Sequence, residues 1–280
     1  MKRLILPIAL LFLATAPVQL SAQAETDSTG LPGDNLDLYG VLELFKKANT
    51  MEEFEKSLNA ESNQVNNLDL DADGNVDYIK VIDNTDSGAH AISLRVDIDD
   101  KESQDIAVIE LDKTGTETAD LQIVGDEELY GENYIIEPAE DEKGATEDKF
   151  NSKFNSRIII VNVWGWPCVR HVYAPAYVVW VSPWRYHHYP PYFKPWRPVA
   201  WRVHHGRVVR YHHHCRRAQA HRIHRAHRVH HRHRVHSPGY HQRNAAHRGN
   251  GPRGGKQNGG GHKNNGGGNK GGGHRGGGRR

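Results

Sequence analysis

The spacing of hydrophobic residues predicts two short helices between residues 38 and 58. From Leu38 to Phe45, apolar residues recur at the i, i+3, i+4, i+7 spacing of a helix with one buried face. A second helix is expected to follow Thr50, because Thr50 and Glu53 have the spacing of a capping box. Its last apolar position is Leu58.

After residue 75, alternation of apolar and polar residues replaces the helical spacing and predicts a run of β-strands. The predicted strands are 76–81, 91–98, 105–111, 118–124 and a closing strand at 134–136. Two helices followed by antiparallel strands are typical of an α+β domain, for which we set the bounds 31–137. We expect this domain to bury one modest core.

The hydrophobic pattern changes again beyond the predicted domain. Residues 138–156 are polar and charged and are expected to form a linker. Residues 157–201 are rich in aromatic residues and proline, which disfavours helices and central strands there; we expect 158–181 to pack and 184–201 to be exposed. Residues 202–280 form a His/Arg/Gly-rich low-complexity tail. From 249 to 280, 16 of 32 residues are glycine, and disorder is expected.

The first 24 residues have the pattern of a secretory signal peptide. Lys2 and Arg3 precede an apolar run, and Ala22-Gln23-Ala24 fits the small-residue cleavage pattern. We therefore expect an exported protein that is periplasmic, outer-membrane-associated or secreted. No later segment has about 18 uninterrupted apolar residues, so no transmembrane segment is predicted in the mature chain.

The net charge of +2 conceals two oppositely charged halves. Residues 25–150 contain all 34 acidic residues and nine Lys and Arg, a net charge of −25. Residues 151–280 contain 25 Lys and Arg and no acidic residue, together with 19 of the 20 histidines. Such asymmetry indicates a tail that binds polyanions or that docks on its own acidic domain.

The segment NLDLDADGNVDYIKV predicts a calcium site. Acidic residues occupy positions 1, 3, 5 and 9 of a D-x-D-x-D-G-x-x-D loop, Gly74 permits a sharp turn, and a backbone carbonyl can serve at position 7. Hard oxygen ligands at this spacing suit Ca²⁺. The predicted ligands are Asp69, Asp71, Asp73, Asn75 and Asp77.

This loop is not an EF-hand, because position 12 is Lys80 and a strand pattern follows. It resembles the calcium loops of FG-GAP repeats and, more distantly, those of dockerins and thrombospondin type 3 repeats. Because calcium is usually abundant around secreted proteins, we expect such a site to be permanently filled and structural. The alternative is a β-hairpin with an Asp-Gly turn and solvated acids.

The tail contains a repeat, HRIHRAHRVHHRHRVH, in which histidine recurs every three residues. Neighbouring imidazoles can share Zn²⁺, Ni²⁺ or Cu²⁺ when neutral. The repeat would form a spiral of histidines on an α-helix and a line of them on a polyproline II helix. The candidate transition-metal ligands are His212, His213, His214, His221, His224, His227, His230, His233 and His236.

Arginines in the same repeat predict binding to polyanions, because guanidinium pairs with phosphate, sulfate and carboxylate. For an exported chain, the expected partners are anionic polysaccharide, lipopolysaccharide or extracellular DNA. Two further interpretations stay open: the tail docks on the acidic domain, or it is solvated and has no ligand. The candidate polyanion-binding residues are Arg222, Arg225, Arg228, Arg232 and Arg234.

The two cysteines, Cys168 and Cys215, fit either a disulfide in an oxidising compartment or a Cys-His metal site beside His212–His214. The chain lacks G-x-S-x-G, H-E-x-x-H and P-loop motifs, so we predict no enzymatic activity. The favoured function is a calcium-stabilised binding or structural protein with a cationic tail. The alternative is a periplasmic divalent-metal buffer.

The stretches LPGDNLDLYGVLELFKKANTMEEFEKSLN, YGENYIIEP and WPCVRHVYAPAYVVWVSPW resemble a family of secreted, uncharacterised bacterial proteins. The resemblance covers about residues 31–201. It implies an exported bacterial protein with a variable basic tail, and it supplies no activity or catalytic residue.

Overall fold

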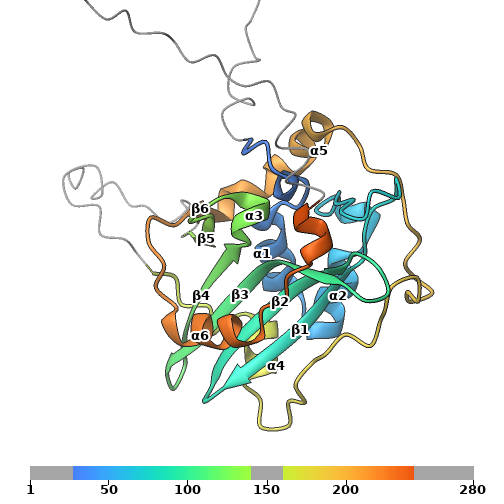
Figure 1. The fold of residues 1–280 in the computed structure, drawn as a ribbon. Helices are drawn as coiled ribbons and strands as arrows, with labels where there is room; N and C mark the ends of the chain where they lie inside the picture. The colour runs from blue at the N-terminus through green and yellow to red at the C-terminus, as the bar shows by residue number, and fades with distance from the viewer. Residues whose placement is uncertain (1–27, 140–159, 243–280) are drawn as a thin grey trace, which may run out of the picture.

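The computed structural model describes residues 28–139 and 160–242, which form a six-stranded antiparallel sheet with helices on both faces (Figure 1). The α+β class predicted from the sequence is confirmed. The predicted signal peptide, most of the linker and the Gly-rich residues 249–280 lie outside the described residues. Within the described ranges, no helix is long and apolar enough to cross a membrane.

The sheet follows the order of the chain, with each strand antiparallel to its neighbours. Its last strand comes from the basic half and pairs with β5, so that Cys215 lies opposite Pro138. The strands are β1 (Ile79–Asp86), β2 (Ala89–Asp97), β3 (Ser103–Gly115), β4 (Thr118–Gly125), β5 (Ile135–Pro138) and β6 (Cys215–Arg217).

The two predicted N-terminal helices are present and begin at side-chain caps. Asp37 accepts a hydrogen bond from Gly40 N, and Thr50 accepts one from Glu53 N. The α-helices are α1 (Leu38–Lys47), α2 (Met51–Leu58), α3 (Glu127–Tyr130), α4 (Pro167–Val172), α5 (Trp201–Val208) and α6 (His224–His233). The 3₁₀-helices are η1 (Pro32–Asn35), η2 (Glu61–Asn63) and η5 (Val209–His214).

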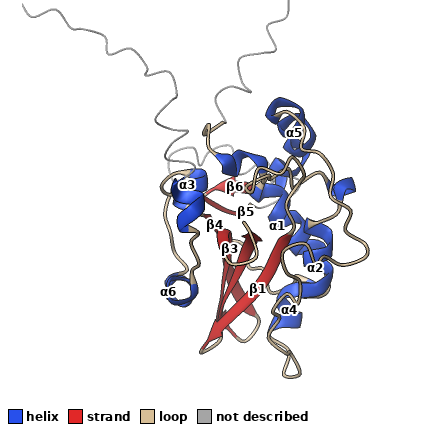
Figure 2. Cartoon of the chain, turned by 45° about the vertical axis from the view of Figure 1, so that its right-hand side comes forward, coloured by secondary structure: helices blue, strands red, loops and turns tan. Residues whose placement is uncertain are grey.

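One face of the sheet carries the main core. Helices α1, α2 and α4 cover it, and side chains such as Phe45 and Phe54 are fully buried there (Figure 2). The expectation that the 157–201 segment excludes helix is wrong for α4. Pro167 occupies the first turn of α4, where its missing N–H and fixed φ cost nothing.

The aromatic segment runs along the free edge of β1. Asp83 N donates to Trp180 O at 2.8 Å and Ser182 N donates to Val81 O at 3.0 Å. Exposure in this segment differs from expectation, because Val178 is 83% exposed whereas Phe193 is 6% exposed. The backbone bonds satisfy an edge strand that would otherwise present unpaired polar groups.

A buried carboxylate fastens this segment to α2. Glu55 accepts hydrogen bonds from Tyr78 Oη (2.8 Å), Trp180 Nε1 (3.0 Å), Ser182 Oγ (2.8 Å) and Val81 N (3.1 Å). Burial raises the pKa of Glu55, and these donors partly offset the shift.

Residues 202–242 are folded, so the predicted start of the low-complexity tail at residue 202 does not mark the end of the structure. We call residues 218–242 the strap. The His-Arg repeat within it is α-helical, and it lies on the second face of the sheet as α6 (Figure 2). Apolar residues recur every three positions from residue 223 to residue 229 of the repeat. Ile223, Ala226 and Val229 are buried against β2 and β3.

Candidate functional site

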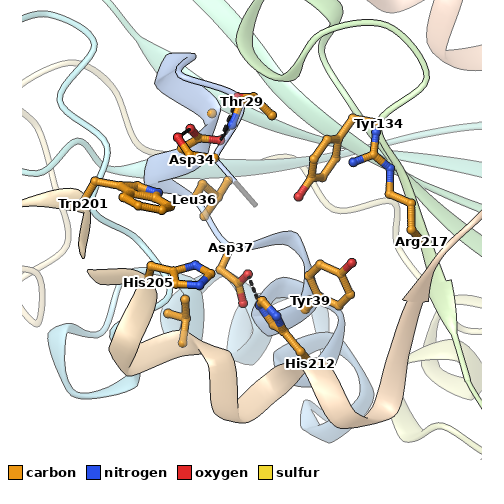
Figure 3. A pocket seen from close by; sticks show the side chains of 13 residues that line it. Thr29, Asp34, Leu36, Asp37, Tyr39, Tyr134, Trp201, His205, His212 and Arg217 are labelled. Carbon is orange, nitrogen blue, oxygen red and sulfur yellow. Dashed lines mark hydrogen bonds and ion pairs between the residues drawn. The ribbon is translucent and has the colours of Figure 1, made fainter. Parts of the chain in front are cut away.

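A cavity of about 250 Å³ lies where the two halves of the chain meet (Figure 3). Residues near the start of α1 form one wall, and α5 and η5 form the other. Trp201 and Tyr134 lie on opposite sides of it (Figure 3). This size is near the lower end of the range for small-molecule pockets.

The acidic side chains of this cavity already have partners. The carboxylate of Asp34 accepts hydrogen bonds from Ser28 Oγ (2.7 Å), Thr29 N (3.1 Å), Thr29 Oγ1 (2.7 Å) and Gly30 N (2.9 Å). Asp37 Oδ1 lies 2.9 Å from His212 Nε2. Both carboxylates therefore already have hydrogen-bond partners within the chain.

Aromatic and cationic groups provide the rest of the lining. Trp201 stacks on His205, with ring centroids 5.0 Å apart, and the guanidinium of Arg217 lies 3.9 Å from the ring centroid of Tyr134. Burial raises the pKa of Tyr134, so its hydroxyl stays protonated and able to donate a hydrogen bond. The arrangement offers two aromatic groups and a nearby fixed cation.

The predicted calcium loop brings three carboxylates together. Oxygens of Asp69, Asp71 and Asp73 lie within 4.8 Å of one another. Backbone amides of the loop orient them: Gly74 N donates to Asp69 Oδ2 at 3.2 Å and Asp73 N donates to Asp71 Oδ1 at 3.0 Å. Gly74 has a φ of 86°, the left-handed conformation that favours glycine.

The donor set of this loop fits a cation. Asp69 Oδ1 is buried and has no hydrogen-bond partner within the described residues. Burial raises the pKa of Asp77 well above its usual range, and its proximity to Asp71 and Asp69 adds to the increase although a bond from Leu70 N opposes it. A divalent ion would compensate this concentration of negative charge.

Sequence reasoning missed two further features of the loop. Tyr186 of the aromatic segment donates to Asp71 Oδ2 at 3.2 Å, linking the loop to that segment. Asp77 is not one of the three converging carboxylates; its Oδ2 accepts from Leu70 N at 2.5 Å. Asn75 N donates to Asp73 Oδ1 at 2.7 Å.

Most arginines assigned to polyanion binding contact carboxylates of this chain. The exception is Arg228, which is exposed. The ion pairs are Arg222 with Glu137, Arg225 with Asp112, Arg232 with Asp86 and Arg234 with Asp126. An external polyanion would have to displace these carboxylates.

The nine candidate transition-metal ligands do not form one site. His221 and His227 meet at Glu110, His230 lies near Asp105, and His212 contacts Asp37. His236 is exposed and lies in a group with Glu128 and His241, which are half-buried. The remaining candidates, His213, His214, His224 and His233, belong to none of the groups of three metal-ligating side chains within the described residues.

Glu110 was missed from the sequence, although its position contained a signal. It is the one acid within the apolar run of β3 from Ile106 to Leu111. Burial would raise the pKa of Glu110, but hydrogen bonds from His221 and His227 outweigh burial and lower it. Glu110 is therefore a buried carboxylate that stays charged.

Both cysteines are free thiols in the structure. Cys168 lies in α4, with its Sγ 3.7 Å from Met51 Sδ, whereas Cys215 begins β6. Burial raises the pKa of both thiols to about 12, which keeps them protonated and makes them poor nucleophiles near neutral pH. Cys215 joins no group of three metal-ligating side chains in the part of the chain that is described.

Comparisons of this chain with protein-family models, with curated proteins and with solved structures give no match.

Proposed function

We propose that this chain is an exported, non-enzymatic protein that binds acidic polysaccharide at the cavity between its two halves, with calcium stabilising the fold. The cavity carries this proposal, because it combines Trp201 and Tyr134 with the guanidinium of Arg217. Aromatic side chains provide flat apolar surfaces and polar tips, which suit the faces and hydroxyls of a sugar ring. A guanidinium pairs with the carboxylate of a uronic acid.

Exposed cations near the cavity favour an anionic polymer over a neutral one. Arg202, Arg207 and Arg210 are exposed on α5 and η5, the elements that also supply Trp201 and His205 to the lining. A polymer whose one unit enters the cavity would pass these side chains. We therefore assign polymer binding to residues 201–217, in place of the strap arginines that are paired with the sheet.

Binding of a uronic acid oligomer to the mature chain, residues 25–280, tests this proposal by calorimetry. We expect oligogalacturonate to bind and neutral dextran oligomers of equal length not to bind. Trp201→Ala and Arg217→Ala should each weaken binding at least tenfold. The matched control is Arg228→Ala, an exposed strap arginine outside the cavity, and its effect should be under twofold.

Other outcomes of the same titration reject the cavity as the binding site. Equal binding by the Trp201→Ala variant and the wild type would do so. Tight binding of duplex DNA or lipopolysaccharide that depends on residues 243–280, with none to oligogalacturonate, would instead assign the function to the C-terminal cations.

Calcium, in this proposal, is a structural ion bound by the converging carboxylates of Asp69, Asp71 and Asp73, with a backbone carbonyl at Asn75. At a free concentration one hundred times its Kd, calcium would stabilise the fold by about 2.7 kcal/mol, or very roughly 5–10 °C in Tm. EDTA should lower the Tm accordingly, and Asp71→Ala should abolish the calcium effect. The control Asp100→Ala, an exposed acid outside the loop, should retain it. A wild-type Tm that is insensitive to EDTA would reject the site.

A further inference from the structure

The strap brings two histidines onto one carboxylate at the centre of the sheet. Glu110 in β3 is fully buried; its Oε1 lies 2.8 Å from His227 Nδ1, and its Oε2 contacts His221 Nε2. Glu110 is more than 100 residues from both histidines in the sequence. Their ligand atoms lie within 4.8 Å of one another.

We propose that Glu110, His221 and His227 form a Zn²⁺ site that fastens the strap to the sheet. Two imidazole nitrogens and one carboxylate oxygen are a donor set that zinc takes in proteins, with bonds of about 2.0–2.2 Å. Tetrahedral zinc would separate these ligand atoms by roughly 3.3 Å. Small changes in the side-chain dihedral angles, which move each ligand atom by less than about 1 Å, would bring the three atoms from the hydrogen-bonded arrangement to that spacing.

The surroundings of the cluster favour a bound cation. The imidazole of His221 also lies close to that of His224, with ring centroids 5.2 Å apart, so His224 or a water molecule can complete four-coordination. When zinc binds, each imidazole coordinates through the nitrogen that faces Glu110 and carries a proton on its other ring nitrogen. A protonated ring therefore loses one proton to solvent, and a neutral ring changes tautomer where necessary. The carboxylate then neutralises one of the two charges of the ion.

The neighbouring arginines of the strap do not compete with zinc for the carboxylate of Glu110. Arg222 pairs with Glu137 and Arg225 pairs with Asp112, so both guanidinium groups are held by neighbouring acids. A zinc ion at Glu110 would add a covalent-like link between β3 and the strap, whose helix α6 also meets β3 through apolar side chains and the ion pair of Arg225 with Asp112. The inference is independent of the proposed polysaccharide binding.

Zinc titration of the mature chain tests the site, with calcium present and at neutral pH. Amide hydrogen exchange in α6 is the readout, because zinc bound to histidines outside the strap leaves this helix unprotected and the variants below separate the histidines within α6. We expect one equivalent of Zn²⁺ to slow exchange in α6 at least tenfold. His227→Ala and Glu110→Gln should remove this protection, whereas His231→Ala, an exposed histidine of the same helix, should keep it.

His227 is the decisive position, because it is exposed and its replacement leaves the sheet intact even if Glu110→Gln fails to fold. Exchange of each variant is compared with its own zinc-free sample. Zinc protection that persists in His227→Ala, or that is lost equally in His231→Ala, would overturn the proposal. Absence of any zinc effect on α6 in the wild type would overturn it too.

Discussion

One face of the sheet is covered by α1, α2 and α4, and α6 packs on the other face (Figure 2). The first interface is built from large aromatic and aliphatic side chains, such as Phe45 and Phe54, which are fully buried. The second has a narrow strip of small residues, with ion pairs around it. The two faces of the sheet are thus covered by very different kinds of side chain.

This contrast implies different responses to solution conditions. Apolar burial stabilises by roughly 25 cal/mol per Å² and depends little on salt or pH. Ion pairs that are partly exposed contribute about 0–1 kcal/mol each and weaken as salt rises. We therefore expect the first face to determine the global stability of the fold and the second to respond to ions.

The largest effect is expected from a cavity on the first face. Phe54 is fully buried in α2 and packs edge-on against Phe45, with ring centroids 5.1 Å apart. Phe54→Ala should lower the free energy of unfolding by about 3–5 kcal/mol. Val229→Ala, the matched change on α6, removes two carbons and should cost only about 1–2 kcal/mol. Urea unfolding of both variants measures the difference.

Equal losses in these two variants would contradict the contrast between the faces. A loss at Val229 that appears only as faster amide exchange in α6, without a change in global unfolding, would sharpen it. The strap would then open locally while the sheet and the first face stay folded.

We expect low pH to destabilise the fold through protonation of the buried residue His204. This residue of α5 is 2% exposed, and its Nε2 has no hydrogen-bond partner within the described residues. Burial lowers the pKa of His204 to about 4, with His205 and Arg207 adding to the decrease and Asp37 opposing it. The folded chain therefore binds this proton only at a lower pH than the unfolded chain does.

Stability should consequently fall as pH falls from about 6.5 to about 4, because in that window the unfolded state binds more protons. The loss attributable to His204 is on the order of 3 kcal/mol. His204→Leu should remove that part of the pH dependence, as measured by urea unfolding at pH 7 and pH 4.5. An unchanged pH dependence in the variant would show that other groups control acid unfolding.

The two faces also differ in how far the sequence predicted them. Helical spacing and the Thr50 cap predicted α1 and α2, because large apolar residues recur at regular intervals there. The buried strip of α6 also consists of apolar residues at regular intervals. Its residues Ala226 and Val229, however, are small and lie within a repeat dominated by His and Arg. Composition suggested a low-complexity tail and concealed the period-three strip.

The candidate sites follow the same division. The acidic loop proposed to bind calcium is local, so the spacing of Asp69, Asp71 and Asp73 predicted that their carboxylates converge. The cavity and the Glu110 cluster join residues from both halves of the chain, and no spacing rule connects them. Charge asymmetry indicated that the halves attract, but it did not specify which carboxylate each cation would meet.

The smallest expected effect is a difference between the two faces in how amide exchange depends on salt. At 1 M NaCl the Debye length falls to about 3 Å, which weakens the pairs of Arg232 with Asp86 and of Arg225 with Asp112. With calcium present and zinc chelated, amide exchange in α6 should accelerate several-fold between 0.05 M and 1 M NaCl, while exchange in α1 stays unchanged. Arg232→Ala, at an exposed pair, should cost under about 0.5 kcal/mol.

The Arg232→Ala variant also provides the internal control, because it should reduce the salt response of α6 without altering α1. Equal acceleration in α1 and α6 would mean that salt acts on the whole fold, and the contrast between the two faces would fail. Acceleration confined to α6 would instead identify the strap as the element whose attachment depends on the ionic conditions.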